Sequence, residues 1–403
     1  MNFHRTCPAA CLRMGLVLLL ALGCASETTP SESRAPLRVG TSGDYAPFSL
    51  EAADGSLAGL DVALARAFAE DRGLRLELVR FRWPELQADL EAGRFDLAWS
   101  GVTIRPERSL RGRFSVPYLE SGAVALVLAG ASARRAEDLD RPGRLIAVNL
   151  GGHLERVARA RFRLASVSPV DGNSNVLAEL LEHRADAVIT DTLEAAHWIA
   201  ASDTPLRILG PFTRDYKAVW LRADKPELAR DLDRWLIARE ADGTLARMRG
   251  EAGIARARGS ATPAAALEAA LIERLSLIPF VAEAKRRSGG PVEVPDRERI
   301  VIEAGERAAR LAAAEAGAPP LDEAGVSSFY RAQIEASKAL QHEILAGPAA
   351  AGEPPDLAKE VRPALLRVGE KIAWLLVRAG LPADPWRSTA AGEQPRDEPG
   401  QHR

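Results

Sequence analysis

The sequence predicts a mixed α/β region followed by an all-α region. From Leu37 to about Gly250, short β-rich runs such as "LRVGTS", "LRLELVRF", "DLAWSGV", "ADAVITD" and "YKAVWLR" alternate with helix-like stretches such as "LDVALARAFAEDRG" and "WPELQADLEAG". This alternation is typical of α/β folds with mostly parallel sheets. From residue 267 onward no strand pattern recurs, and segments 267–345 and 356–380 are rich in Ala, Leu, Glu and Arg with a helical period.

A linker is expected between the two regions, and a disordered tail after them. Segment 254–266, "IARARGSATPAAA", is rich in small residues and contains Gly and Pro, as linkers do. The end of the chain is polar with Pro and Gly, a composition that does not build a core. We therefore expect an α/β domain at 37–253, a linker at 254–266, a helical domain at 267–380 and a disordered tail at 381–403.

Composition points to a small-molecule partner. The chain has 403 residues, enough for two or three domains with hydrophobic cores. Its net formal charge is −2, so it lacks the basic excess typical of nucleic-acid-binding proteins.

The first 24 residues have the pattern of an export signal. Arg5 and Arg13 make a positive start before a short apolar run, "MGLVLLLALG", which is below the roughly 20 residues that span a membrane. The stretch resembles a bacterial lipoprotein signal, in which Cys24 becomes the lipid-carrying first residue; ordinary cleavage is the alternative. The other two cysteines, Cys7 and Cys11, also lie in this leader, so the mature protein has no disulfide. We expect a periplasmic protein that contacts the membrane only through Cys24.

The first region resembles a known fold. The stretches "LRVGTSGDYAPFSLEAADGSLAGLDVALARAFAE", "FRWPELQADLEAGRFDLAWSGVTIRPERS", "FSVPYLESG" and "ADAVITD" resemble the bilobed periplasmic solute-binding proteins of the polar amino-acid type. In that fold two α/β lobes close on a ligand at the carboxyl ends of their strands. The resemblance implies that Tyr45 walls the cleft, that Thr103 and Arg108 hold a ligand carboxylate, and that Gly151 and Gly152 offer backbone N–H groups.

Two of the cleft assignments have plain structural alternatives. Arg108 follows Pro106-Glu107 and would, taken alone, be a surface arginine, although its planar guanidinium suits a carboxylate. Trp83 stands at a helix start and is as well explained by packing as by lining the cleft.

Two further stretches resemble the enzymatic branch of this fold, the periplasmic cyclohexadienyl dehydratases. They are "VNLGGHLERVARARF", which includes Asn149 among the expected substrate contacts, and "DGNSNVLAELLEHRADAVITDTLEA". The sequence departs from the family pattern at Leu150, His153 and Leu154. His153 is therefore either an added hydrogen-bond donor or a tolerated neighbour.

The reaction implied by that branch needs an acid and cations. Prephenate loses its ring hydroxyl and its ring carboxylate together, so catalysis requires a proton for the departing hydroxyl and donors for the carboxylates. Glu194, near the carboxyl end of a predicted strand, is the expected acid with a raised pKa. The alternative is a helix-start glutamate that favours the helix dipole. Asp191 is expected to fix donors in the cleft, and the reaction calls for no metal and no cofactor.

In the second region, Arg274 and Lys285 lie eleven positions apart on what the pattern predicts as one helix. They would leave the same face about 16 Å apart, beside apolar residues that a helix normally buries. The alternative is a pair of flanking charges that extend along an apolar helix to water. Pro279 lies between them and is expected to kink the helix.

The segments "VPDRERIVIEAGERAARLAAAEAG" and "FYRAQIEASKALQ" resemble the exported, all-helical chorismate mutases over roughly 265–380. In such a site inward-facing cations hold a compact dianionic substrate and stabilise charge that grows on its ether oxygen. By this resemblance the carboxylates are held by Arg274, Arg297 and Arg362, the ether oxygen is reached by Lys285 and Gln341, and Ser337 and Glu298 assist binding. Val294 stands where the family usually has an aspartate.

Together the two resemblances predict an exported bifunctional enzyme. It would turn chorismate into prephenate and then prephenate into phenylpyruvate, or arogenate into phenylalanine. The competing hypothesis is a lipid-anchored amino-acid-binding receptor fused to a mutase or a helical interaction domain. The sequence leaves the oligomeric state open.

Overall fold

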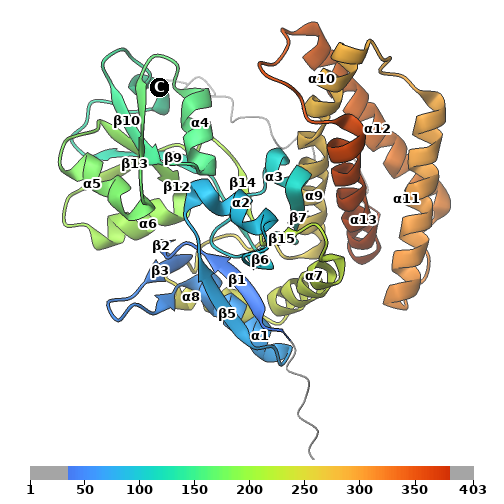
Figure 1. The fold of residues 1–403 in the computed structure, drawn as a ribbon, viewed down its shortest axis with the longest axis horizontal. Coiled ribbons are helices and arrows are strands. Elements are labelled where there is room, and N and C mark those ends of the chain that lie inside the picture. Colours follow the sequence, from blue (N-terminus) through green and yellow to red (C-terminus); the bar gives the residue numbers. More distant parts are fainter. Residues whose placement is uncertain (1–34, 382–403) are drawn as a thin grey trace, which may run out of the picture. The chain divides into compact units, whose positions relative to one another are not determined.

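The α/β region folds as two lobes, each built on a five-stranded sheet (Figure 1). The computed structural model describes residues 35–381, so the predicted leader with Cys24, and residues 382–403, lie outside the described part. In spatial order, the sheet of lobe 1 consists of β5 (Leu76–Arg80), β1 (Leu37–Thr41), β6 (Leu97–Ala98), β15 (Trp220–Arg222) and β7 (Gly112–Phe114). That of lobe 2 consists of β11 (Ser166–Val170), β10 (Leu145–Asn149), β12 (Ala187–Asp191), β9 (Ala123–Leu128) and β13 (Leu206–Leu209).

Parallel pairing holds the centre of each sheet, and antiparallel strands complete it. β1 is parallel to β5 and β6, and β10 is parallel to β11 and β12. Strands β15 and β9 run antiparallel to these. The lobe 1 helices are α1 (Leu60–Asp71), α2 (Leu86–Glu91), α3 (Pro106–Arg111), α7 (Pro226–Ala241) and α8 (Thr244–Glu251). The lobe 2 helices are α4 (His153–Arg161), α5 (Val176–Leu181) and α6 (Thr192–Ala201).

Short elements complete the two lobes. A small antiparallel sheet in lobe 1 is formed by β2 (Asp44–Tyr45), β3 (Ser49–Glu51) and β4 (Leu57–Ala58). The 3-10 turns are η1 (Trp83–Glu85), η2 (Ala136–Leu139) and η3 (Asn173–Asn175).

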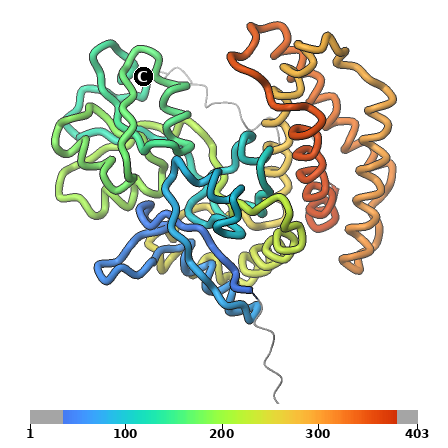
Figure 2. Tube along the Cα trace, viewed as in Figure 1, coloured from blue at the N-terminus to red at the C-terminus, as the bar shows by residue number. Residues whose placement is uncertain are grey.

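The chain passes between the lobes through a separate two-stranded ribbon, which can be followed in Figure 2. Its strands are β8 (Leu119–Ser121) and β14 (Asp215–Lys217), paired antiparallel. The predicted strand "YKAVWLR" is therefore divided, because Tyr216 and Lys217 pair in this ribbon whereas Trp220 to Arg222 pair in lobe 1. Residues just before the break thus lie where the lobes meet.

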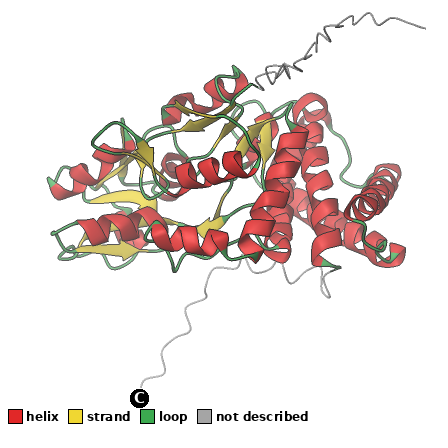
Figure 3. Ribbon diagram, turned by 90° about the horizontal axis from the view of Figure 1, so that it is seen from below, coloured by secondary structure: helices red, strands yellow, loops and turns green. Residues whose placement is uncertain are grey.

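The second region is all-helical, as predicted, and Figure 3 shows no strand in it within the described residues. Its helices are α9 (Pro263–Ser276), α10 (Ile278–Ser288), α11 (Pro295–Ala316), α12 (Glu323–Ala346) and α13 (Arg362–Ala379), with a π-helical turn, η4 (Leu357–Val361), before the last. Helices α11 and α12 approach closely at Gly305, where a Cβ atom would lie 2.3 Å from the Tyr330 ring.

Three boundary predictions need correction. Helix α9 begins at Pro263, inside the predicted linker, because the Thr262 hydroxyl caps it by accepting from Ala265 N at 3.3 Å. Arg274 and Lys285 lie on two helices, not one, because the helix is interrupted at Leu277, just before Pro279. Leu381, assigned to the tail, packs against the hydrophobic core.

One hydrophobic core extends from lobe 1 into the helical region. It includes Phe68, Trp99 and Trp235 of lobe 1 together with Phe329 and Leu375 of the helices. The two faces of the lobe 2 sheet carry separate clusters of their own.

Candidate active sites

The first candidate site is a pocket of about 20 Å³ between the two lobes. Of the cleft residues expected from the sequence, the structure brings these to the pocket: Tyr45, Trp83, Thr103, Arg108, Asn149 and Gly152. It adds five that were not among the expected contacts: Gly101, His153, Leu154, Asn173 and Lys217.

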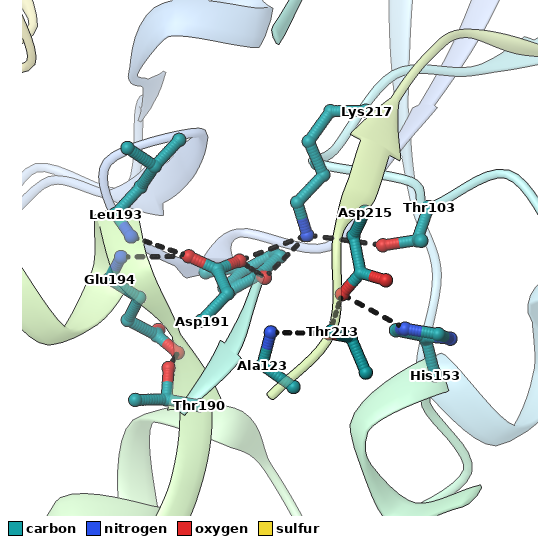
Figure 4. Close-up of polar contacts among 12 residues, drawn as sticks. Thr103, Ala123, His153, Thr190, Asp191, Leu193, Glu194, Thr213, Asp215 and Lys217 are labelled. Atoms are coloured by element: carbon teal, nitrogen blue, oxygen red, sulfur yellow. Dashed lines mark hydrogen bonds and ion pairs between the residues drawn. The ribbon is translucent and has the colours of Figure 1, made fainter. Parts of the chain in front are cut away.

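Asp191 ends strand β12 and caps helix α6 beside this pocket (Figure 4). Its carboxylate accepts from the backbone N–H groups of Leu193 at 2.8 Å and Glu194 at 3.0 Å. It also accepts from the Tyr45 hydroxyl and lies 2.9 Å from Lys217 Nζ. Asp191 therefore contacts a hydroxyl of lobe 1, that of Tyr45, and the ammonium of Lys217 in the ribbon, as well as the start of its own helix.

Glu194 is 1% exposed and lies one turn further along α6. Thr190 Oγ1 donates to one of its oxygens and Asn173 Nδ2 to the other, both at 2.6 Å. Glu194 does not itself line the pocket, but Asn173 does. In this closed arrangement the Asn173 side chain therefore separates the Glu194 carboxyl group from the cleft.

The two carboxyl groups have opposite electrostatic environments. Burial and the neighbouring Asp191 carboxylate raise the pKa of Glu194 well above its ordinary value, against hydrogen bonds from Thr190 and Asn173. Burial alone would raise the pKa of Asp191 too, but Lys217, with hydrogen bonds to the carboxylate, lowers it. Two adjacent carboxyl groups whose pKa values are shifted in opposite directions are the arrangement that separates a proton donor from an electrostatic partner.

Lys217 is the residue that sequence reasoning missed. It is 2% exposed at the end of β14, and its ammonium donates to Tyr45 Oη at 3.0 Å and to Thr103 Oγ1 at 3.1 Å. The sequence did carry a signal, since a lysine inside the apolar run "YKAVWLR" has to be buried or to end the strand.

Arg108 is a buried cation. One of its terminal nitrogens donates to Thr103 O at 3.1 Å, and its guanidinium lies 5.8 Å from the centre of the Trp220 ring. Burial, with nearby Arg105 and Arg156, lowers the pKa of Arg108 well below its ordinary value. Among residues 35–381 no carboxylate lies within 4 Å of it. A surface arginine is therefore excluded, and the site favours an anionic ligand.

The glycine turn after β10 behaves differently at its two positions. The Gly151 N–H donates to Glu155 Oε2 at 2.7 Å, so it is not free for a ligand, contrary to expectation. Gly151 has a φ of +76°, and a Cβ atom there would lie 2.7 Å from Pro84 of lobe 1. Gly151 thus allows close approach of the lobes, while Gly152 is the N-cap of α4 and lines the pocket.

His153 faces the ribbon between the lobes. Its Nε2 lies 3.1 Å from Asp215 Oδ2, which also accepts from Thr213 Oγ1 at 2.9 Å (Figure 4). Burial alone would raise the pKa of Asp215, but His153 and Lys217 lower it. His153 thus has a protein partner of its own beside the pocket.

Contacts between the lobes hold the cleft closed. Asn173 N donates to Asp44 Oδ2 at 2.9 Å, and Arg82 donates to Asp171 at 2.7 Å. A ligand larger than the pocket requires these contacts to open, which also separates Asn173 from lobe 1 and uncovers the region around Glu194.

The second candidate site lies among the helices. Arg274 of α9 donates to Ser337 Oγ of α12 at 2.8 Å, and burial lowers its pKa. Gln341, one turn after Ser337, donates to Ser337 O at 3.0 Å. Its Oε1 atom is buried without a hydrogen-bond partner in the described chain, as are Gln333 Oε1 and Tyr330 Oη. Unpaired buried polar atoms around a cation are typical of a site that awaits a polar ligand.

Lys285 and its neighbours complete this second site. Its ammonium donates to Val292 O at 3.0 Å. Burial and Arg362 lower its pKa, against the opposing effect of Glu293 and Glu298. Glu298 lies 3.3 Å from Lys338 Nζ. The structure therefore brings Arg362 and Glu298 into the electrostatic surroundings of Lys285.

Arg297 and Val294 have no side-chain contact with Arg274 or Lys285 in the described part of the chain. Both are exposed near the start of α11, and Arg297 has no ion-pair partner within 4 Å among the described residues. The Val294 side chain has no polar atom, and its backbone N–H donates to Glu298 Oε1 at 3.4 Å. Tyr330 and Gln333, which the sequence reasoning did not select, lie closer to Arg274.

Neither a metal site nor a membrane-spanning helix is found within residues 35–381. No group of three or more His, Cys, Asp or Glu side chains there is arranged to hold a metal ion. No helix in the same part of the chain has the length and apolar character to cross a membrane.

Two α/β lobes that close on a pocket lined by a buried arginine and a buried lysine are typical of a solute-binding fold. Residues 37–251, more than half of the chain, match the family described as bacterial extracellular solute-binding proteins, family 3, and the chain belongs to that family. Residues 265–342 match chorismate mutase type II.

Curated relatives include an enzyme and binding proteins. Cyclohexadienyl dehydratase of Pseudomonas aeruginosa is 39% identical over 161 residues, which are 40% of this chain and 60% of that protein. The chain thus aligns with less than two thirds of that enzyme's length. The L-cystine-binding protein TcyJ of Escherichia coli is 32% identical over 202 residues, 49% of this chain and 75% of that protein.

The solved structures that are similar to the first region include amino-acid-binding proteins. The ancestral amino acid-binding protein AncCDT-1, a precursor of cyclohexadienyl dehydratase, is 32% identical with a TM-score of 0.51 and covers 54% of this chain and 94% of that one. The arginine-bound substrate-binding protein AbpA of Streptococcus pneumoniae is 27% identical with a TM-score of 0.51, covering 54% and 94%.

Proposed function

We propose that this protein is an exported bifunctional enzyme that rearranges chorismate to prephenate among its helices and dehydrates prephenate, or arogenate, between its lobes. The observation that carries the proposal is the buried carboxyl group of Glu194, which lies beside Asp191 behind a cation-lined pocket and has a pKa raised well above its ordinary value. The match of the helical region to chorismate mutase supports the first step, because the product of that step is the substrate of the second.

In the cleft, the residues divide the work of a decarboxylative dehydration. Arg108 and Lys217 supply positive charge for the substrate carboxylates, and Thr103 adds a hydroxyl donor. Glu194 gives its proton to the ring hydroxyl, which leaves as water. The electrons of the ring C–carboxylate bond then complete the aromatic ring as carbon dioxide leaves. Solvent reprotonates Glu194 when the lobes open.

Among the helices, the site has only to hold chorismate in its compact conformation and stabilise the charge that develops in the transition state. Arg274 binds one substrate carboxylate. Arg362, which lies near Lys285, binds the other. Lys285 and Gln341 meet the ether oxygen, on which negative charge grows as the C–O bond breaks. Substrate binding then replaces the contact of Lys285 with the Val292 carbonyl.

The competing function is an amino-acid receptor, and the amino-acid-binding relatives favour it. A receptor needs cations and donors in its cleft but no buried acid that stays protonated. Glu194 therefore distinguishes the two hypotheses.

The test of the proposed function is conversion of chorismate alone. Purified protein supplied with chorismate, without metal or added cofactor, should yield phenylpyruvate, detected by its absorbance in alkali and by mass spectrometry. Supplied with prephenate, it should yield the same product. Stoichiometric binding of an amino acid with no product from either substrate would favour the receptor.

Export and anchoring are tested separately. The full-length protein expressed in bacteria should partition into the detergent phase, because two acyl chains on Cys24 bury many CH₂ groups in the micelle. The Cys24→Ala variant should move to the aqueous phase. Identical partitioning of the two proteins would mean that Cys24 carries no lipid.

A further inference from the structure

A second cavity, of about 260 Å³, lies where lobe 1 meets the helical region. It is far larger than the pocket between the lobes and is lined from α3, β7 and α7 on one side and from α9, α11 and α13 on the other. Nothing in the two proposed reactions uses it.

Two charged groups in this cavity lack full partners. Asp233 of α7 is 6% exposed; its Oδ1 atom accepts from Val116 N at 2.6 Å, and no cation of the described chain lies within 4 Å of the carboxylate. Burial raises its pKa to about 6, so it is largely ionised at neutral pH. Arg367 of α13 donates through one terminal nitrogen to Ser109 O and Leu110 O, but its Nε atom is buried without a partner.

Most of the other charged groups that line the cavity are already paired. Lys371 lies 2.7 Å from Glu273 Oε2, Arg113 lies 3.5 Å from Glu370, and Arg230 lies 3.1 Å from Glu227. Glu315, the remaining carboxylate of the wall, is exposed to solvent. A ligand therefore finds one buried carboxylate without a cation beside it, Asp233, and one partly buried guanidinium, Arg367, for an anion. The rest of the wall is largely apolar and includes Phe114, Leu311, Val368 and Trp374.

We propose that this cavity binds a free α-amino acid with an apolar side chain, its ammonium on Asp233, its carboxylate on Arg367 and its side chain against Leu311 and Trp374. A ligand with both charges satisfies both unpaired groups at once, whereas an amine or a carboxylate alone leaves one of them desolvated. The cavity is slightly below the usual range for ligand pockets of roughly 300–1,000 Å³, so the ligand is small.

The cavity also adjoins a contact between the two candidate active sites. Ser109 Oγ donates to Glu273 Oε1 at 2.8 Å, and both residues line the cavity. Ser109 directly follows Arg108 of the cleft, and Glu273 directly precedes Arg274 of the helical site. An amino acid bound here would therefore lie beside the link between the two sites.

The experiment is isothermal titration of L-phenylalanine and L-leucine into the whole protein and four variants. Asp233→Asn keeps the bond from Val116 but removes the charge, and Leu311→Asp places a carboxylate at a wall position that is 66% exposed. Each should weaken binding by roughly tenfold or more, the scale for losing or opposing one charged hydrogen bond. Phenethylamine, which lacks the carboxylate, should bind the wild-type protein more weakly than L-phenylalanine by a similar factor.

Two matched controls separate the cavity from the rest of the protein. Asp231→Asn changes a carboxylate on the same helix that pairs with Arg72, and Leu366→Asp changes a leucine of α13 that is 60% exposed and does not line the cavity. Both should bind as wild type does. Equal affinity in all five proteins would place the amino acid in the cleft between the lobes and overturn the proposal, as would absence of binding to the wild-type protein. Because Leu311 is exposed, its variant remains informative even if Asp233→Asn does not fold.

Discussion

Replacement of Glu194 by Gln should lower the turnover of prephenate by roughly 10²–10⁴-fold, the usual contribution of a general acid. The amide keeps the shape of the side chain and can still accept from Thr190, but it has no proton to give to the departing hydroxyl. The helical site should be unaffected, so prephenate should accumulate from chorismate at the wild-type mutase rate. Acidifying the sample, which aromatises prephenate without enzyme, should then recover phenylpyruvate.

The pH dependence gives a second readout for Glu194. A general acid acts in its protonated form, so wild-type kcat/KM for prephenate should fall as pH rises through the raised pKa of Glu194. The residual activity of the Gln variant should lack that decline. Glu179→Gln, in the same lobe and paired with Arg184 at the surface, is the matched control and should keep the wild-type profile. Normal dehydration by Glu194→Gln would mean that another group supplies the proton, and it would contradict the role proposed for Glu194.

Lys285→Ala should lower mutase turnover by roughly 10²-fold or more, the scale for losing one charge contact in the transition state. The measurement is the loss of chorismate absorbance, with dehydration of added prephenate as the internal reference. Arg287→Ala, two positions further on the same helix and exposed, removes a cation that contacts Gly352 O and should leave the rate unchanged. Normal mutase rates in Lys285→Ala would mean that Lys285 and Arg274 are charges at the border of apolar helices and not part of an active site.

The two fold classes and most strands could be predicted because burial leaves a clear pattern in the sequence. Strands β1, β10 and β12 are buried on both faces and form apolar runs. Strands β11 and β13 were not among the predicted runs because they lie at the edges of the lobe 2 sheet, where half-exposed residues, and Pro169 in β11, weaken the signal.

The candidate sites were predictable where a local motif carries the chemistry. Asp191 ends strand β12 and Glu194 comes three residues later, so the sequence places both at the carboxyl end of the strand. Lys217 was not predicted because its role depends on Asp191 and Tyr45, which are remote in sequence and come together only through the ribbon between the lobes. The hydrogen bond that occupies the Gly151 N–H depends likewise on the side-chain conformation of Glu155, which sequence periodicity does not reveal.

The contact between lobe 1 and the helices joins residues 164 positions apart and has no local signature either. Sequence reasoning treated segment 254–266 as a divide between independent units. The structure instead shows hydrogen bonds from Arg367 and Lys371 of α13 to the backbone of lobe 1.

The hydrophobic core shared by lobe 1 and the helices bears on how the protein melts. A domain that owns its core can unfold alone, but here the same buried aromatic and aliphatic side chains support both candidate sites. Heat that disorders the helices exposes the apolar surface of lobe 1 as well, so the dehydratase activity should not survive at temperatures where the mutase activity is lost. Lobe 2, with cores of its own, is the part of the molecule free to unfold at a different temperature.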